Sequence, residues 1–247
     1  MVRGTRVNIS VREWQHPASP TLEHLRDEDV HVWHWTHESA FALGADPYRL
    51  LSPDERARAA RYLVEKPRRE FVATRSTLRQ ILGAYLETPP EGITFQYSAR
   101  GKPLLVRNSE IGFNVSHSEG LSVLAVAREY GLGVDVEWIR PDVEAAALAE
   151  RFFSADERMR LLRFSGEELT QAFFRCWTRK EAYIKATGDG LSLALDSFDV
   201  SLEPDAASAL LGTRPDATEA QRWIVSDLHL ANGYAAALAR SASRNME

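Results

Sequence analysis

Residues 133–137 read Gly133-Val134-Asp135-Val136-Glu137, and residues 177–185 read Trp177-Thr178-Arg179-Lys180-Glu181-Ala182-Tyr183-Ile184-Lys185. In the first stretch, two carboxylates stand one residue apart in an apolar run, and alternate residues of a strand point to the same face. In the second stretch, Trp177, Glu181 and Lys185 follow one another at intervals of one helical turn and share one stripe of a helix. Three carboxylates and a lysine that converge on one place are what a divalent cation needs to hold a polyphosphate.

The two stretches predict different secondary structures. Val123–Ala127 and Leu132–Val136 are apolar runs typical of neighbouring buried strands, joined by a polar turn at residues 128–131. The helical periodicity of Gln171–Ala186, followed by Gly188, predicts a helix that ends at the glycine. The two carboxylates of the second strand therefore point together to one face.

Further along the chain, two short segments at residues 191–193 and 197–201 are predicted strands. Residues 203–220 are rich in Ala, Pro, Asp and Thr and are predicted to form a surface connection. Residues 223–225 and 233–238 are predicted to pair as a closing hairpin.

Each of the two opening stretches has an ordinary alternative. Asp135 and Glu137 fit a strand end that emerges into solvent, and Glu181 and Lys185 fit an exposed i,i+4 ion pair. Trp177 on the same helical stripe favours a site, because tryptophan usually marks a buried or cleft-facing surface. Two like charges side by side on a strand also favour a cation or a base between them.

Short motifs follow one another along the chain: Arg100-Gly101-Lys102-Pro103, Phe113-Asn114-Val115-Ser116-His117-Ser118, the stretch 133–137, Arg151-Phe152-Phe153-Ser154, the stretch 177–185 and Gly188-Asp189-Gly190-Leu191-Ser192. In this order they resemble the motifs of the 4′-phosphopantetheinyl transferases, specifically of the Sfp-type enzymes with a Trp-x-x-Lys-Glu-Ala motif. The resemblance covers roughly residues 50 to 200. Each motif is weak alone, and their common order makes the resemblance specific.

The resemblance implies an α+β fold of two similar α/β subdomains related by a pseudo-twofold, with the active site in the cleft between them. It implies that coenzyme A and an apo acyl or peptidyl carrier protein give the holo carrier protein and adenosine 3′,5′-bisphosphate. The carrier protein supplies the serine nucleophile, so no serine of this chain needs to be catalytic.

The resemblance also implies roles for individual residues. The ligands of a Mg²⁺ ion, or of Mn²⁺ in its place, would be Asp135, Glu137 and Glu181, with Glu137 binding directly or through a water. The residues that contact coenzyme A would be Lys102, Ser116, His117 and Lys185. Glu181 would accept the proton of the carrier serine, directly or through a metal-bound water, and Lys185 would stabilise or protonate the departing bisphosphate. For Ser116, capping of its own turn is the alternative.

The chain also repeats itself. Residues 52–71 and 154–173 share eight identities in twenty positions at an offset of 102 residues, and each copy opens with a serine and acids typical of a helix start. Shared helix-start chemistry is an alternative explanation for part of this match. The repeat predicts two similar halves, residues 1–125 and 126–247, with a ligand-binding cleft between them.

Beyond the repeat, the first copy has Arg75 and Arg79 at the positions where the second copy has Trp177 and Glu181. Eight basic residues stand against two acids from Arg56 to Arg79, a local charge of +6 in a chain of net charge -5. An arginine-rich helix face is ordinarily just solvated, but opposite a phosphorylated ligand some of these residues bind phosphate oxygens bidentately. The predicted phosphate ligands are Arg75 and Arg69, followed by Arg58. The others would steer an acidic carrier protein.

Length and composition agree with an enzyme, since 247 residues, 44% of them hydrophobic, can form a substantial core. No apolar run is long enough to span a bilayer, and no apolar segment follows the basic amino terminus as in a secretory signal. The single cysteine, Cys176, cannot form an internal disulfide. A monomeric cytoplasmic protein is expected. Nucleic acid is not an expected partner, because the basic segment lacks interleaved aromatic residues and the net charge is negative.

Two other functions remain open on the sequence: a catalytically silent module that binds coenzyme A and a carrier protein, and a metal-dependent phosphohydrolase of a small nucleotide. Ser116 and His117 do not indicate a serine hydrolase, because adjacent residues rarely meet as nucleophile and base. His31 and His34 do not indicate zinc, because the strand-like alternation around them sends their side chains to opposite faces. The carrier could belong to fatty-acid, polyketide or non-ribosomal peptide synthesis.

Overall fold

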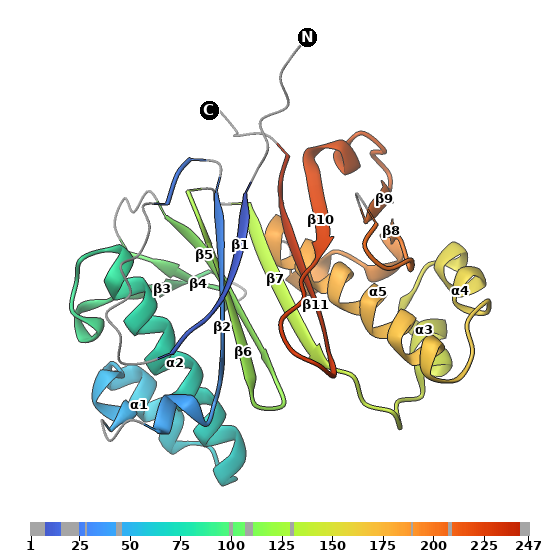
Figure 1. Ribbon diagram of the computed structural model, residues 1–247. Coiled ribbons are helices and arrows are strands. Elements are labelled where there is room, and N and C mark those ends of the chain that lie inside the picture. Colours follow the sequence, from blue (N-terminus) through green and yellow to red (C-terminus); the bar gives the residue numbers. More distant parts are fainter. Residues whose placement is uncertain are drawn as a thin grey trace.

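The computed structural model describes residues 8–15, 25–27, 29–42, 46–98, 101–106, 111–128, 131–188, 190–206 and 209–242. Arg100 and Asp189 of the motifs above, and residues 129–130 of the predicted turn, lie outside these ranges. Two sheets stand side by side at the centre of the molecule, and helices lie on the outer side of each (Figure 1). In the described part of the chain, every helix is too short or too polar to cross a membrane.

The first half contains a four-stranded sheet. Its main elements are β1 (Ile9–Glu13), β2 (Val30–Thr36), α1 (Pro53–Ala60), α2 (Glu65–Tyr85), β3 (Phe95–Tyr97), β4 (Pro103–Leu105), β5 (Gly112–Ser118) and β6 (Leu121–Ala127). The strand order is β1-β2-β6-β5, in which β1 runs parallel to β2 and the other pairs are antiparallel. β3 and β4 form a separate hairpin.

The second half contains a three-stranded sheet. Its main elements are β7 (Leu132–Trp138), α3 (Ala145–Phe152), α4 (Ala155–Leu161), α5 (Gly166–Thr187), β8 (Phe198–Val200), β9 (Leu210–Thr213), β10 (Trp223–Asp227) and β11 (Tyr234–Ser241). The strand order is β10-β11-β7, antiparallel throughout, and β8 pairs with β9. α5 ends at Gly188, whose φ of 77° is the left-handed conformation that terminates helices, as the sequence predicts.

The two halves follow the same order of elements. Strands β2-β6-β5 of the first sheet correspond to β7-β11-β10 of the second, and α1 and α2 correspond to α4 and α5. Ser52 and Ser154 begin α1 and α4, and each forms a capping box with the glutamate three residues later. The predicted boundary at residue 125 lies inside β6, however. The chain passes from one sheet to the other between Ala127 and Leu132.

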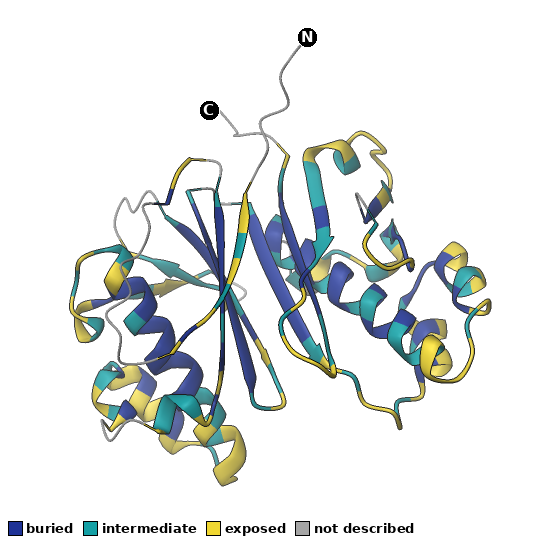
Figure 2. Ribbon diagram, viewed as in Figure 1, coloured by how far each residue is buried: buried dark blue, intermediate teal, exposed yellow. Residues whose placement is uncertain are grey.

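Three apolar clusters hold the layers together (Figure 2). The first fills the space between α2 and the first sheet, and another joins α5 to the second sheet. The third lies between the sheets, where Val32 and Val123 of the first half meet Val134 and Leu238 of the second. Strands β6 and β7 are therefore buried on both faces, which explains their nearly continuous apolar runs.

The prediction that β6 and β7 are neighbouring strands is wrong in its pairing. Both segments are strands, but β6 pairs with β2 and β5, whereas β7 pairs with β11 alone. A short link between two apolar runs ordinarily makes a hairpin. Here β7 instead pairs with β11 in the second sheet, and it still packs on the first sheet through its side chains.

Downstream of α5 the predictions hold in part. The strand at β8 and the closing hairpin of β10 and β11 are confirmed. Residues Gly190–Ser192 form a short 3-10 helix where a strand is predicted. The predicted surface connection contains β9. The sequence did not predict this strand, because the apolar run at Leu210 is short and is flanked by loop-forming residues.

Gly133 lets β7 lie directly against α5. A Cβ atom at this position would stand 2.1 Å from the carbonyl oxygen of Ala182 and 2.4 Å from the amide nitrogen of Ala186, closer than such atoms approach. The strand and the helix can therefore meet only at a glycine. Asp135 and Glu137 follow at alternate positions, so they point to the same side as Gly133, toward α5.

Candidate active site at the junction of the two halves

Three elements meet at the carboxylate of Asp135. Its Oδ1 accepts hydrogen bonds from Lys185 Nζ of α5 at 2.6 Å and from Ser116 Oγ of β5 at 2.8 Å. Lys185 Nζ also lies 2.9 Å from Ser116 Oγ and 3.3 Å from the carbonyl oxygen of Val134. The structure thus brings together three residues that the sequence assigns to one site. The contact joins the two halves, because β5 belongs to the first sheet and β7 and α5 belong to the second.

The second oxygen of Asp135 has no such partners. Oδ2 is buried and accepts no hydrogen bond from any described residue, although the whole side chain is only 4% exposed. A buried carboxylate oxygen without a partner is costly, and a cation supplied with a ligand would relieve that cost.

Glu137 and Glu181 share the surroundings of Asp135. Glu137 Oε2 accepts a hydrogen bond from Ser118 Oγ at 2.8 Å, while no described residue donates to the carboxylate of Glu181. Burial, and then the negative charge of Asp135, raises the pKa of Glu181. Burial also raises the pKa of Glu137, partly offset by the hydrogen bond from Ser118. The acids therefore repel one another, and the positive charge of Lys185, which is paired with Asp135, offsets this repulsion only in part.

As the side chains stand, the described residues contain no group of three or more His, Cys, Asp or Glu side chains that could hold a metal ion. The chemistry of the donors nevertheless fits a hard cation. Among the described residues, neither Asp135 Oδ2 nor the carboxylate of Glu181 has a hydrogen-bond donor, and burial, together with the charge of Asp135, raises the pKa values of Glu181 and Glu137.

Lys102 and His117 lie at the edge of this group. Lys102 Nζ donates to the carbonyl oxygen of Lys185 at 2.6 Å and to that of Leu132 at 3.2 Å, which leaves one ammonium hydrogen for a ligand. Burial and the charge of Lys185 lower the pKa of Lys102 to about 8. The side chain of His117 is exposed at the surface, but the protein packed around its ring, and then Lys185, lower its pKa.

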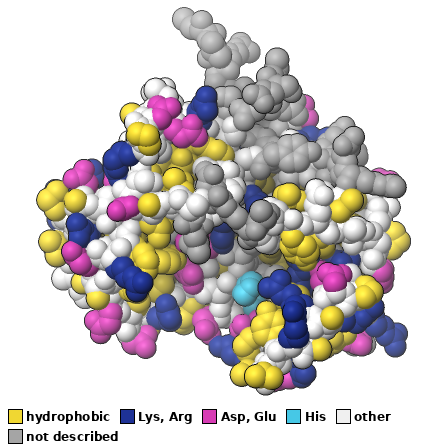
Figure 3. All heavy atoms as spheres, turned by 180° about the vertical axis from the view of Figure 1, so that it is seen from behind, with side chains coloured by type: hydrophobic (Ala, Val, Ile, Leu, Met, Phe, Trp, Pro, Cys, Tyr) yellow, Lys and Arg dark blue, Asp and Glu magenta, His cyan; other side chains and the backbone are white. Residues whose placement is uncertain are grey.

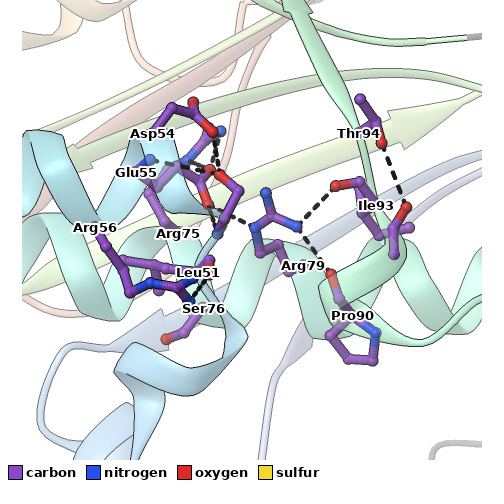
Figure 4. Close-up of polar contacts among 12 residues, drawn as sticks. Leu51, Asp54, Glu55, Arg56, Arg75, Ser76, Arg79, Pro90, Ile93 and Thr94 are labelled. Atoms are coloured by element: carbon purple, nitrogen blue, oxygen red, sulfur yellow. Dashed lines mark hydrogen bonds and ion pairs between the residues drawn. The ribbon is translucent and has the colours of Figure 1, made fainter.

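Arg75 does not lie at an open surface, contrary to what the prediction of a phosphate ligand requires. The residue is 6% exposed, and it donates to Glu55 Oε1 at 2.6 Å (Figure 4). It also donates to Tyr97 Oη at 3.0 Å. Arg79 binds the other oxygen of Glu55 at 2.6 Å. Burial alone would raise the pKa of Glu55, but the charge of Arg75 and the hydrogen bond from Arg79 lower it. We therefore assign Arg75 to the core of the first half and not to phosphate binding.

The other two predicted arginines are exposed and lie on aromatic rings. The guanidinium carbon of Arg69 is 4.1 Å from the ring centre of Phe41, and that of Arg58 is 5.0 Å from the ring centre of Phe71. These contacts orient the planar groups and leave their N–H donors accessible. Trp177, the third member of the helical stripe, stacks on Phe173 and contacts Phe153, so its role is packing.

Two residues at the junction of the halves were not among the site residues predicted from the sequence. Asn114 Oδ1 accepts the backbone N–H of Val134 at 2.8 Å, and Ser118 Oγ accepts that of Trp138 at 3.1 Å. Together with Ser116 they occupy alternate positions on β5 and reach β7, although the two strands form no backbone ladder. The polar alternation of residues 114–118 on a strand was the signal that could have found them.

On the face opposite to the view of Figure 1, the surface is hollowed below the centre of the molecule. A histidine and side chains of both charges come together there (Figure 3).

Two family models match adjacent parts of the chain. The N-terminal model of the 4′-phosphopantetheinyl transferases matches residues 34–129, and the model of the 4′-phosphopantetheinyl transferase superfamily matches residues 131–239. The change from one model to the other coincides with the passage from β6 to β7.

Individual relatives agree with the family models. The chain is 42% identical to 4′-phosphopantetheinyl transferase HetI of Nostoc sp. over 191 residues, which cover 76% of this chain and 80% of the relative. It is 32% identical to 4′-phosphopantetheinyl transferase Sfp of Bacillus subtilis over 155 residues, covering 63% of this chain and 68% of the relative. The chain belongs to the 4′-phosphopantetheinyl transferase family.

Proposed function

We propose that this protein transfers 4′-phosphopantetheine from coenzyme A to a serine of an apo carrier protein. The serine oxygen forms a bond to the phosphorus next to the pantetheine, the bridging P–O bond of the pyrophosphate breaks, and adenosine 3′,5′-bisphosphate leaves. The observation that carries the proposal is the contact of Lys185, Asp135 and Ser116 across the two halves in a chain of this family.

Glu181 is the proposed proton acceptor for the carrier serine. Its carboxylate has no hydrogen-bond donor among the described residues, and burial raises its pKa toward the range in which a carboxylate is a more effective base. Lys185 keeps the charge of Asp135 balanced and presents its ammonium group to the diphosphate, where negative charge grows during the transfer.

The phosphates of coenzyme A are proposed to lie against Ser116, His117 and Lys102, with Arg58 and Arg69 on the first half as further contacts. All of these have hydrogen-bond donors, and the charge of Lys185 contributes to the lowered pKa values of both Lys102 and His117. An acidic carrier protein is the proposed partner of the remaining exposed arginines.

Mg²⁺, or Mn²⁺, would bind to Asp135, Glu137 and Glu181. When bound, such an ion neutralises phosphate charge and polarises the phosphorus that is attacked. The unpaired Oδ2 of Asp135 and the mutual repulsion of the acids support this assignment.

The test is the mass of apo carrier proteins after incubation with the enzyme, coenzyme A and Mg²⁺. We expect the mass of one phosphopantetheine to be added, and we expect Asp135→Ala to reduce the rate by at least about a hundredfold while the protein stays folded. Asp142→Ala, which removes an exposed acid of the turn after β7, is the matched control and should keep full activity.

The alternatives predict other results. Bound coenzyme A without any transfer to a panel of carriers would indicate a silent binding module. Release of bisphosphate at the same rate with and without carrier would indicate a phosphohydrolase.

A further inference from the structure

The strands β5 and β7 are joined by side chains in place of a backbone ladder. Asn114, Ser116 and Ser118 alternate along β5, and each reaches a group of β7. The first binds a backbone amide, the second binds the carboxylate of Asp135, and the third binds both kinds of group. Ser118 therefore differs from its neighbours in linking the backbone of β7 to an acid of the site.

The hydrogen bonds of Ser118 have only one possible direction. The amide of Trp138 can only donate, so Ser118 Oγ accepts from it at 3.1 Å. The hydroxyl proton is then available for Glu137 Oε2, at 2.8 Å, which leaves Oε1 of the same carboxylate for another partner. The hydroxyl thus selects which oxygen of Glu137 stays available.

The turn that follows Ser118 is held by both halves. Glu119 Oε2 binds Lys66 Nζ of α2 at 2.5 Å, and the carbonyl oxygen of Glu119 accepts from Tyr234 Oη of β11 at 2.7 Å. Both contacts lie at the surface, so they contribute little to the free energy of unfolding. They do restrict the position of the β5–β6 turn, and with it that of Ser118.

We propose that Ser118 is a positioning residue, which orients the carboxylate of Glu137 from the opposite half so that its free oxygen can bind a divalent cation. The inference rests on the proposed function, because it assigns Glu137 to the metal. A second residue that binds a metal ligand typically changes metal affinity by about ten- to a hundredfold when it is removed.

The experiment measures binding of Mn²⁺ to the full-length protein in the presence of coenzyme A, from the electron paramagnetic resonance signal of free Mn²⁺. We expect Ser118→Ala to raise the Kd for Mn²⁺ by about ten- to a hundredfold, and Ser118→Thr, which keeps the hydroxyl, to restore it to within a few-fold. Ser201→Ala is the matched control. Ser201 Oγ likewise accepts a backbone N–H, that of Glu203 at 3.1 Å, but contacts no acid of the site, so its Kd should equal that of the wild type.

A double-mutant cycle with Glu137→Ala separates the possible failures. If Ser118 acts through Glu137, Ser118→Ala has no further effect on Mn²⁺ binding once Glu137 is alanine. An equal effect in both backgrounds, or no effect of Ser118→Ala while Glu137→Ala weakens binding, would overturn the positioning role and leave the proposed function intact. Unchanged Mn²⁺ binding in Glu137→Ala would remove Glu137 from the metal, and the inference with it.

Discussion

Single residues of the site differ in how far their charges are compensated. Asp135 Oδ1 has two donors, Glu137 has one, and Glu181 has none among the described residues. The residue with the fewest partners is the one that we propose as the general base, and a general base must keep a free oxygen for the proton that it accepts. Its isolation also makes the ligand-free protein less stable than it could be.

Glu181→Gln should therefore stabilise the ligand-free protein at pH 7 and reduce transfer by at least about a hundredfold. A carboxyl with a raised pKa holds its proton more tightly in the folded state, so its contribution favours folding below the ordinary pKa of 4.5 and is lost as pH rises through the raised value. The gain in melting temperature should thus be seen at pH 7 and disappear near pH 4. Full activity of the variant would contradict the assignment of Glu181 as the proton acceptor.

His117 allows a second test at the same scale. Its lowered pKa means that the ring is mostly neutral at pH 7, and a phosphate beside it would favour the charged form. Binding of coenzyme A should then take up a proton, which titration calorimetry at pH 7 detects as a dependence on the ionisation enthalpy of the buffer. His117→Gln should abolish most of that dependence. Heats that do not vary with buffer in the wild type would show that His117 does not meet a phosphate.

Secondary-structure elements place these residues by close approach. β7 lies against α5 because Gly133 presents no side chain to Ala182, and this contact brings Asp135 within reach of Lys185. Buried ion pairs join the helices within each half. In the first half, Glu55 of α1 binds Arg75 and Arg79 of α2. In the second half, Glu157 of α4 binds Lys180 of α5 at 2.8 Å. Each pair ties a short helix to a long one.

Gly133→Ala should destabilise the protein by several kcal/mol, at or beyond the upper end of the roughly 1–3 kcal/mol usual for an overpacked core, because a Cβ would stand 2.1 Å from a backbone oxygen. Thermal unfolding followed by circular dichroism measures the change. Gly212→Ala on β9 is the control, since a Cβ there would have nothing within 4 Å, and it should unfold like the wild type. Similar melting temperatures for the two variants would show that β7 and α5 are farther apart than the structure places them.

For the whole molecule, the central cluster makes the halves depend on each other. Val32, Val123, Val134 and Leu238 are each 0% exposed, and they come from both sheets. Separation of the halves would expose one complete face of each sheet, at a cost of about 1.5–3 kcal/mol for each large apolar side chain. The site has the same dependence, since its hydrogen bonds cross from β5 to β7.

Residues 1–130 and 131–247, produced separately, should therefore each lack a cooperative thermal transition. Mixing the two fragments should recover near-ultraviolet circular dichroism, because the cluster forms only when both sheets are present. A cooperative transition of either fragment alone would contradict the shared core.

The sequence by itself determined the faces of their elements that the candidate site residues occupy. The spacing of Asp135 and Glu137, and the helical spacing of Glu181 and Lys185, predicted their orientation, because side-chain direction within one element depends only on the period of that element. The family motifs predicted that these residues meet, and the contact of Lys185 with Asp135 confirms that part.

Only the tertiary structure decided which partners they have. Burial of β6 and β7 was evident from their composition, but the choice of a pairing strand depends on competing partners far along the chain. The sequence predicted that Arg75 binds phosphate, but in the structure it is paired with Glu55, twenty residues before it. Lys102 likewise donates to the carbonyl oxygen of Lys185, 83 residues away in the chain. The periodicity of a helix or strand predicts the direction of a side chain. The partner of that side chain depends on packing between elements far apart in the sequence, which no local pattern predicts.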